Sequence, residues 1–364
     1  MRPVKRRERI VVAMSGGVDS SVAAAWLVDG GYDVVGVTLH LWDYPDDGDA
    51  RTRCCAPEDQ HDARRVADGL GIPHYAFDRR ELFAREVVEP FVDAYLSGAT
   101  PSPCSTCNRA VKMGELFAIA DRLGAAKVAT GHYARIVRRG NRAELHRGKD
   151  RGKDQSYFLS NLCDAELERL EFPLGESSKA EVRRDALARQ LPGATKGESQ
   201  ELCFVPTGRY DAFIEERAAG RVRPGVIVDA DGRMVGRHGG VHRFTLGQRK
   251  GLGVALREPA YVAAIEPESG TVRLGRERDL LHAGARLSHT RFFRDVALPA
   301  RAAVQVRYRH AAVSATVARD EHGVRVDFDE PVRAVASGQA LVAYDGDRVL
   351  GGGTIERAFA MGVA

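Results

Sequence analysis

The feature that most constrains the fold is a strand-like run followed at once by a glycine- and serine-rich turn and a helix. Residues 10–14 are apolar, residues 15–21 read Ser-Gly-Gly-Val-Asp-Ser-Ser, and an alanine-rich helical pattern covers 20–28. Two glycines let the backbone bend close to a phosphate, and N–H groups and hydroxyls at a helix start can cradle its oxygens. We therefore predict a phosphate-binding loop rather than an ordinary capped turn.

The following residues continue the same alternation of strand and helix. Glycines close the helices, and Pro57 and Pro90 mark a helix start and a bend or break. The pattern predicts strands at 33–39, 72–77 and 127–130, and helices at 57–70, 79–96 and 108–123. Such alternation is typical of an α/β fold with a parallel sheet covered by helices, whose ligands sit at the carboxyl ends of the strands.

The second half of the chain has a different pattern. Short alternating runs separated by charged or glycine-bearing turns predict an antiparallel β-barrel or sandwich, with strands at 303–308, 312–318, 324–328, 339–344 and 348–354. Residues 224–250 predict a small β-rich middle domain with a basic loop at 242–250, where Arg243, Arg249 and Lys250 could meet a nucleic-acid backbone. The expected domains are 1–212, 213–282 and 283–364.

Composition limits the class of protein. The chain has 364 residues and a formal net charge of +4, so a polyanionic partner requires positive charge gathered on one face. There is no signal-peptide pattern and no run of roughly 20 apolar residues, which predicts a cytoplasmic protein. Six cysteines are too few for a disulfide scaffold. For Cys54 and Cys55, we favour a buried pair over a redox role.

Cys104 and Cys107 form a Cys-x-x-Cys motif just before the helix predicted at 108–123. Two prolines precede the motif, and Arg109 and Lys112 follow it. We therefore expect Cys107 near the positive end of a helix dipole, where the pKa of a thiol falls. A single Cys-x-x-Cys also fits half of a zinc site. Cys203 is a possible distant partner.

The loop at 15–21 is neither a Walker loop nor a dinucleotide-binding fingerprint. It resembles the PP-loop of ATP pyrophosphatases. This resemblance implies that the loop holds the pyrophosphate end of ATP while a carbonyl oxygen is adenylated and pyrophosphate is released. Asp19 would then help to place Mg²⁺.

Over nearly its whole length the chain resembles the tRNA-specific 2-thiouridylase (MnmA/TrmU) family. The resemblance implies an adenine nucleotide alpha hydrolase-like fold for the N-terminal domain. The matching blocks are the PP-loop, 100–108, 129–133, 153–159, Cys203 with Phe204, 245–253, 306–309 and 337–339. The resemblance implies a tRNA-uridine 2-sulfurtransferase that adenylates O2 of the anticodon wobble uridine and inserts sulfur. The products would be 2-thiouridine, AMP and pyrophosphate, with a cysteine desulfurase or relay protein as persulfide donor.

The resemblance also implies roles for particular residues. Cys107 would be the nucleophile, Cys203 would carry the persulfide, and Ser102, Pro103 and Cys104 would line the target base. The implied ATP ligands are Ala13, Met14, Ser15, Gly16, Gly17, Val18, Asp19, Ser20, Ser21, Leu39 and Gly131. The remaining implied tRNA contacts are His132, Lys153, Asp154, Gln155, Arg307, Tyr308 and Gln339.

Cys104 departs from the family pattern, because many members have Asp there. With Cys107 and Cys203 it gives three thiols, which could hold a [4Fe-4S] cluster with one open iron. Persulfide relay and cluster chemistry stay open as alternatives. Two other classes compete with the thiouridylase: a PP-loop synthetase acting on a small carboxylate, and a non-catalytic RNA-binding module with a structural metal.

Overall fold

The computed structural model describes residues 7–43, 57–195, 202–205, 208–256 and 258–360. Cys54 and Cys55 lie outside these residues. The chain divides into two compact units. Unit 1 comprises 1–87, 104–208 and 347–349, and unit 2 comprises 88–103, 209–346 and 350–364. The three expected domain boundaries stay predictions.

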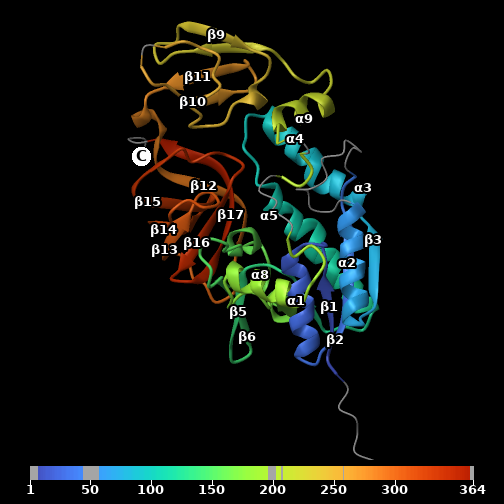
Figure 1. Ribbon diagram of the computed structural model, residues 1–364. Coiled ribbons are helices and arrows are strands. Elements are labelled where there is room, and N and C mark those ends of the chain that lie inside the picture. Colours follow the sequence, from blue (N-terminus) through green and yellow to red (C-terminus); the bar gives the residue numbers. More distant parts are fainter. Residues whose placement is uncertain (1–6, 44–56, 196–201, 206–207, 257, 361–364) are drawn as a thin grey trace, which may run out of the picture. The chain divides into compact units, whose positions relative to one another are not determined.

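Unit 1 is built on a five-stranded parallel sheet (Figure 1), as predicted. Its strand order is β3-β2-β1-β4-β7. The strands are β1 (Arg9–Ala13), β2 (Asp33–His40), β3 (His74–Asp78), β4 (Lys127–Ala129) and the short β7 (Leu170–Glu171), which was not predicted. β1 lies at the centre and is apolar at almost every position, because both faces of the sheet are covered.

Helices cover both faces of this sheet. Ile10 and Val12 of β1 pack with apolar residues of α1 (Val18–Asp29) and α2 (Pro57–Leu70), while α6 (Gly114–Arg122) packs on β1 and β4. α8 (Lys179–Ala188) packs against α1. The remaining short helices of unit 1 are α3 (Arg80–Phe83), a π-helical segment (Ala84–Val88), α7 (Asp164–Arg169) and a 3-10 turn (Ser156–Leu159).

Two predicted helices differ from the structure. The helix expected at 79–96 is interrupted by the π-helical segment, and Pro90 lies in the first turn of α4 (Glu89–Leu96), where a proline costs no hydrogen bond. The helix expected at 108–123 begins earlier, as α5 (Pro103–Cys107), and continues through a second π-helical segment (Asn108–Met113) into α6.

A hairpin completes unit 1. Strands β5 (Ala134–Arg139) and β6 (Arg142–Arg147) pair antiparallel. Residues 347–349 return to this unit. The Asp347 carboxylate accepts a 2.7 Å hydrogen bond from the Arg135 guanidinium, and Arg348 pairs with His146. The hairpin is therefore anchored by residues 347–349, and the Arg135–Asp347 contact spans 212 residues of sequence.

Unit 2 contains the predicted small β-rich region. Its sheet has the order β10-β11-β8-β9 and a buried apolar core that includes Ile227, Val262 and Val272. The elements are α4, α9 (Tyr210–Arg217), β8 (Gly225–Val228), β9 (Met234–His238), a 3-10 turn (Val241–Arg243), β10 (Tyr261–Glu266), β11 (Thr271–Gly275) and a 3-10 turn (Glu277–Leu280).

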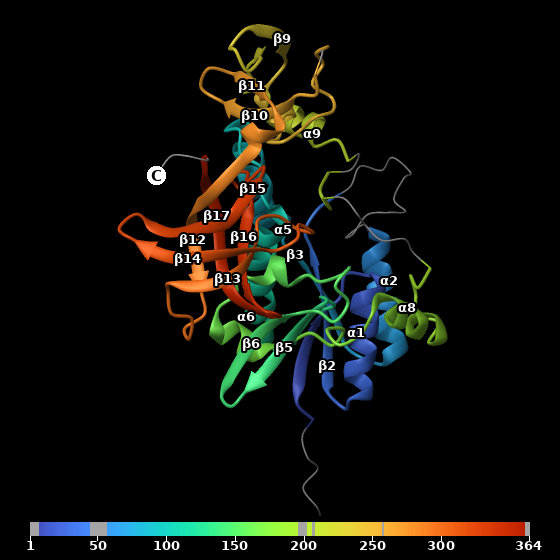
Figure 2. The same ribbon diagram turned by 90° about the vertical axis from the view of Figure 1, so that its left-hand side faces the viewer.

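A closed antiparallel barrel forms the rest of unit 2 (Figure 2). Its strands are β12 (Leu281–Phe292), β13 (Ala300–Gln305), β14 (Val313–Asp320), β15 (Gly323–Arg333), β16 (Ala340–Asp345) and β17 (Arg348–Ala360). Pairing of β12 with β17 closes it, which confirms the barrel over the sandwich and removes unpaired edges. In the described part of the chain, no helix is long and apolar enough to span a bilayer.

Candidate active site

The loop after β1 has a backbone that only glycine permits. Gly16 has φ +75°, and a Cβ built on it would lie 2.1 Å from the carbonyl oxygen of Asp59. Gly17 is extended and forms the N-cap of α1. The chain thus turns sharply against α2 and presents the unsatisfied N–H groups of the first turn of α1, which is the arrangement that binds phosphate oxygens.

The serines of the loop bind its own backbone and one another. The Ser15 N–H donates to Ser20 Oγ over 3.2 Å, and the hydroxyls of Ser20 and Ser21 each donate to the Gly17 carbonyl over 3.0 Å. The loop is therefore folded by its own polar groups rather than by a ligand. Of the other implied ATP ligands, Met14 and Leu39 are buried, and Gly131 lies so close that a Cβ there would be 2.8 Å from the Ser20 nitrogen.

Two residues that the sequence reasoning did not assign to the site hold Asp19. The Lys179 ammonium donates to both carboxylate oxygens over 2.7 Å, and the Tyr133 hydroxyl donates to Oδ1 over 2.8 Å. A detectable signal existed for Lys179. Ser178 and Glu181 form a capping box, a Ser-x-x-Glu pattern that marks a helix start and so places Lys179 in the first turn of α8.

His132 follows the strand β4 at the same end of the sheet as the loop. Its Nδ1 lies 2.7 Å from the Thr130 hydroxyl. Burial, with a smaller effect of the Lys112 charge, lowers the pKa of His132 to about 3. The imidazole is therefore neutral near pH 7 and can offer a hydrogen bond, but not a positive charge, to a ligand.

The two cysteines of the Cys-x-x-Cys motif differ sharply in exposure. Cys104 is exposed, whereas Cys107 is 6% exposed. Burial raises the pKa of Cys107, and the opposing effect of Lys112 is smaller. The prediction of a lowered pKa was wrong, because burial decides the shift. In addition, α5 begins at Pro103, so Cys107 lies at its end rather than at the positive end of a helix dipole.

Cys203 lies in a turn held by its neighbours. The Val205 N–H donates to the Leu202 carbonyl over 3.0 Å, and buried Phe204 packs edge-on against Phe83, with ring centroids 5.6 Å apart. Cys203 itself is partly exposed. All three cysteines lie among the described residues, and within these no group of three His, Cys, Asp or Glu side chains is placed to hold a metal ion. Both the persulfide relay and the three-thiolate cluster stay predictions.

The segment 153–155 forms a tight turn beside the hairpin. The buried Asp154 carboxylate accepts hydrogen bonds from Arg147 and from the Gly148 and Ser156 N–H groups, all within 3.1 Å. Gln155 accepts from the Tyr133 N–H. Asp154 therefore shapes the turn, whereas Lys153 and Gln155 are only partly buried. The tRNA contacts of all three stay predictions.

In unit 2, Gln339 is one of the residues implied for tRNA contact, and its segment is joined to Thr100 by a pair of hydrogen bonds, here called the clasp. Gln339 Nε2 donates to the Thr100 carbonyl over 2.8 Å, and the Thr100 N–H donates to the Ser337 carbonyl over 2.8 Å. The clasp fixes the chain just before Ser102 and Pro103. Arg307 donates to carbonyls at 333 and 334, and Tyr308 packs with Arg309.

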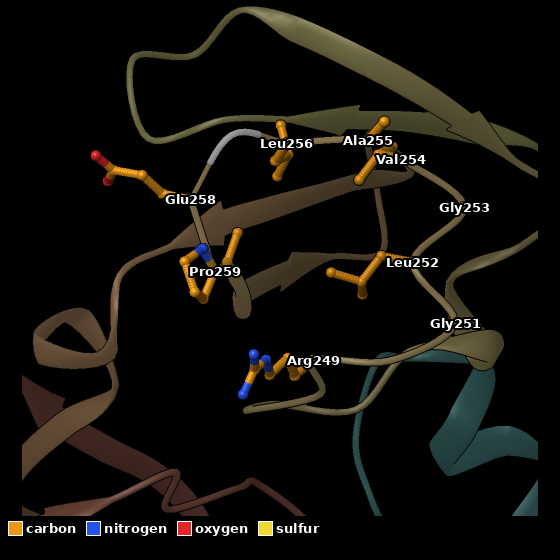
Figure 3. Close-up of a pocket in the computed structure, with 10 residues that line it drawn as sticks. Arg249, Gly251, Leu252, Gly253, Val254, Ala255, Leu256, Glu258 and Pro259 are labelled. Carbon is orange, nitrogen blue, oxygen red and sulfur yellow. The ribbon is translucent and has the colours of Figure 1, made fainter.

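The predicted basic loop of unit 2 is only partly basic at its surface. His242 is fully buried, and both its Nε2 and the Arg243 guanidinium bind Glu215. Arg249 and Lys250 are exposed. Arg249 and the residues that follow it line a cavity of about 500 Å³ (Figure 3). The lining residues are Arg249, Gly251, Leu252, Gly253, Val254, Ala255, Leu256, Glu258, Pro259 and Ala260.

Fold and loop together define the class: an α/β protein with a PP-loop at the end of the first strand of a parallel sheet. The family described as "tRNA methyl transferase HUP domain" matches residues 8–207. The family described as "tRNA methyl transferase PRC-barrel domain" matches residues 211–276, and the one described as "Aminomethyltransferase beta-barrel domain" matches 283–355.

Relatives extend this match over the full chain. A protein of Sorangium cellulosum named tRNA-specific 2-thiouridylase MnmA is 61% identical over 356 residues, covering 96% of this chain and 92% of that one. One of Solibacter usitatus with the same name is 48% identical, covering 95% and 99%. The chain belongs to the tRNA-specific 2-thiouridylase family.

Among solved structures, a 4-thiouridine synthetase in complex with RNA and bound ATP matches with a TM-score of 0.35 and 14% identity, covering 59% of this chain and 51% of that one. A likeness of this size says nothing further about either protein.

Proposed function

We propose that this chain is a tRNA-uridine 2-sulfurtransferase that uses ATP to convert the anticodon wobble uridine to 2-thiouridine, releasing AMP and pyrophosphate. The observation that carries the proposal is the full-length likeness to proteins named tRNA-specific 2-thiouridylase, in a chain whose phosphate loop is intact. A uridine carbonyl is a poor electrophile, and adenylation of its O2 oxygen turns that oxygen into part of a leaving group.

ATP would bind with its pyrophosphate end over the loop at 15–21. Backbone N–H groups of the loop and of the first turn of α1 would take the phosphate oxygens. Mg²⁺ is commonly held by one or two carboxylates together with substrate phosphates, so Asp19 suffices as a protein ligand. Lys179, now paired with both Asp19 oxygens, lies where its charge can also offset that of the phosphates.

Sulfur would come from a persulfide on Cys203, loaded by a persulfide-carrying protein. The terminal sulfur attacks C2 of the adenylated uridine, and AMP leaves with the former O2 oxygen. The Cys107 thiolate attacks the Cys203 Sγ, so that the sulfur–sulfur bond of the persulfide breaks and a Cys107–Cys203 disulfide forms. A dithiol reductant then restores both thiols. Because Cys107 is buried, substrate binding must expose it first.

We propose the persulfide route rather than an iron–sulfur cluster, because it needs only the two thiols of Cys107 and Cys203 and a dithiol reductant. Anaerobic purification with iron analysis tests this choice. We expect a colourless protein with full activity. A brown, iron-bearing protein that loses activity on chelation would instead establish the cluster.

tRNA would contact both units. We propose contacts from Lys153, Gln155 and His132 in unit 1 and from Arg307, Tyr308 and Gln339 in unit 2, with Ser102, Pro103 and Cys104 near the target base. The base must leave the anticodon stack to be modified. Because phosphate contacts release counterions, tRNA affinity should fall steeply with salt.

The test is incubation with unmodified tRNA, ATP, Mg²⁺ and a sulfide or persulfide source, followed by mass spectrometry of the nucleosides. We expect 2-thiouridine together with AMP and pyrophosphate. Cys107→Ser and Cys203→Ser should abolish transfer from the persulfide but leave ATP binding intact. A methylated uridine, or ADP and phosphate as products, would contradict the proposal.

A further inference from the structure

We propose that Tyr133 is a positioning residue that couples the RNA-contacting segment 153–155 to the phosphate loop. The inference rests on the proposed function, because it takes residues 153–155 to meet tRNA and residues 15–21 to meet ATP. Tyr133 belongs to neither segment, yet it is hydrogen-bonded to both.

The backbone of Tyr133 is tied to Gln155 in both directions. The Tyr133 N–H donates to Gln155 Oε1 over 2.9 Å, and the Gln155 N–H donates to the Tyr133 carbonyl over 2.9 Å. The space around this carbonyl is tight, since a Cβ built on Gly148 would lie 2.7 Å from it. The Tyr133 backbone therefore follows any shift of Gln155.

The side chain of Tyr133 carries this position to the loop. It is 3% exposed, and its hydroxyl donates to Asp19 Oδ1 over 2.8 Å. The Lys179 ammonium lies 5.8 Å from the centre of the Tyr133 ring and binds the same carboxylate. Tyr133 thus fixes both the carboxylate proposed for Mg²⁺ and the cation beside it.

A second connection joins the same two regions. Asp150 accepts the Lys179 N–H over 2.9 Å with one carboxylate oxygen and the Gly152 N–H over 3.1 Å with the other. The Lys153 N–H donates to the Asp150 carbonyl over 3.0 Å. The turn at 150–155 therefore holds Lys179 by its backbone and Asp19 through Tyr133.

Ordering the turn has a consequence for ATP. RNA that fixes residues 153–155 also restricts Tyr133 and Lys179, so that ATP binding loses less conformational freedom at Asp19. The coupling must be reciprocal, and ATP must raise tRNA affinity by the same factor. ATP would then be bound most tightly when the tRNA to be adenylated is present.

The test measures binding of an ATP analogue with a methylene between the α and β phosphates, in Mg²⁺, with and without unmodified tRNA. For the wild type we expect tRNA to raise affinity about tenfold, within the usual range of coupling. Tyr133→Phe removes only the hydroxyl that reaches Asp19. It should reduce the ratio to about twofold or less, while analogue affinity without tRNA changes far less.

Tyr32→Phe is the matched control, because the Tyr32 ring also lies beside a lysine, with Lys127 Nζ 6.0 Å from its centre. It should keep the wild-type ratio. Asp150→Ala tests the second connection and should also lower the ratio, which keeps the proposal testable should Tyr133→Phe fold poorly.

A folded Tyr133→Phe protein with the wild-type ratio would overturn the coupling, as would a wild type whose analogue affinity ignores tRNA. If Tyr133→Phe is unfolded, an unchanged ratio in Asp150→Ala overturns it. The proposed function fails separately, if the wild type forms no 2-thiouridine in the assay described above.

Discussion

The phosphate loop and Cys107 lie in the same unit but differ in how ready they are for their chemistry. Loop serines bind the loop's own backbone, Gly16 is fixed against Asp59, and Asp19 is held by two partners. Cys107, by contrast, is buried, and burial raises the pKa of its thiol. The phosphate loop is therefore preorganised, whereas the Cys107 thiol is guarded, in the sense that burial shields it.

This difference indicates which of the two regions must change when substrate binds. ATP can meet a loop whose backbone geometry is already set, so the backbone loses little free energy to rearrangement, and the coupling to tRNA proposed above concerns the side chains of Asp19 and Lys179. A protonated, buried thiol cannot attack a persulfide until something exposes it, because the thiolate is the nucleophile. In the proposed mechanism, burial of Cys107 would keep persulfide cleavage from running ahead of uridine adenylation and would protect the thiol from oxidation.

The largest effect should come from breaking the preorganised side. Gly16→Ala places a methyl group 2.1 Å from the Asp59 carbonyl oxygen on a backbone with φ +75°, so the loop must move. A displacement of about 1 Å near a reacting group costs roughly 100-fold in rate. We expect a loss of that size in 2-thiouridine formation and a clear loss of ATP-analogue affinity, measured by titration.

Gly31→Ala controls for backbone strain alone. Gly31 has φ +82°, but a Cβ there meets nothing within 4 Å. It should cost on the order of 1 kcal/mol in unfolding free energy and leave analogue affinity unchanged. Wild-type analogue binding by Gly16→Ala would show that the loop is not preorganised in the way described.

The shielding of the Cys107 thiol is tested by alkylation of the folded protein at pH 8, followed by peptide mass spectrometry. Since Cys104 is exposed, whereas Cys107 is buried and burial raises the pKa of its thiol, Cys104 should react much faster than Cys107. In urea the two rates should converge. Equal rates in the folded protein would remove the contrast between loop and helix.

The raised pKa of Cys107 also determines how the unfolding free energy changes with pH. A thiol whose pKa is raised on folding contributes stability that is present below its unfolded pKa and is lost as pH rises through the folded pKa. The unfolding free energy of the wild type should therefore fall more steeply above about pH 8.5 than that of Cys107→Ser.

The sequence carried enough signal for the regular parts of the fold. An apolar run before Gly16 and Gly17 located β1, an apolar run after Gly30 and Gly31 located β2, and Pro57 located the start of α2, because these signals are local. β12 was missed because its alternation is disrupted by register shifts, including one between His282 and Gly284. Such bulges disturb the period of two on which strand prediction depends.

The site was predicted where one segment suffices and missed where distant segments meet. The loop at 15–21 could be found because glycines and serines stand together in sequence. Lys179 and Tyr133 reach Asp19 from 160 and 114 residues away, and only the fold shows this meeting. The pKa of Cys107 was predicted in the wrong direction because burial, which decides it, depends on tertiary packing.

His132 tests whether the region beside the phosphate loop is fixed in the same way as the loop itself. Its pKa is lowered to about 3, so it should show no NMR titration between pH 5 and pH 8. A histidine with a depressed pKa contributes stability that is lost as pH falls from about 6.5 towards that value, by up to about 1.4 kcal/mol per pH unit. His132→Gln should flatten this acid loss. Titration near pH 6.5 would mean that the region is open rather than fixed like the loop.

The smallest effect should come from Ser178→Ala, which loosens the loop at its edge. Ser178 Oγ accepts the Glu181 N–H in the capping box that begins α8, and the next residue, Lys179, binds Asp19. Loss of such a cap costs about 1 kcal/mol in unfolding free energy. Because that energy corresponds to about fivefold in affinity, ATP-analogue binding should weaken by no more than this. Ser177→Ala, which leaves the box intact, should change neither quantity. If Ser178→Ala weakened binding as much as Gly16→Ala, Lys179 rather than the loop backbone would be the main anchor of ATP.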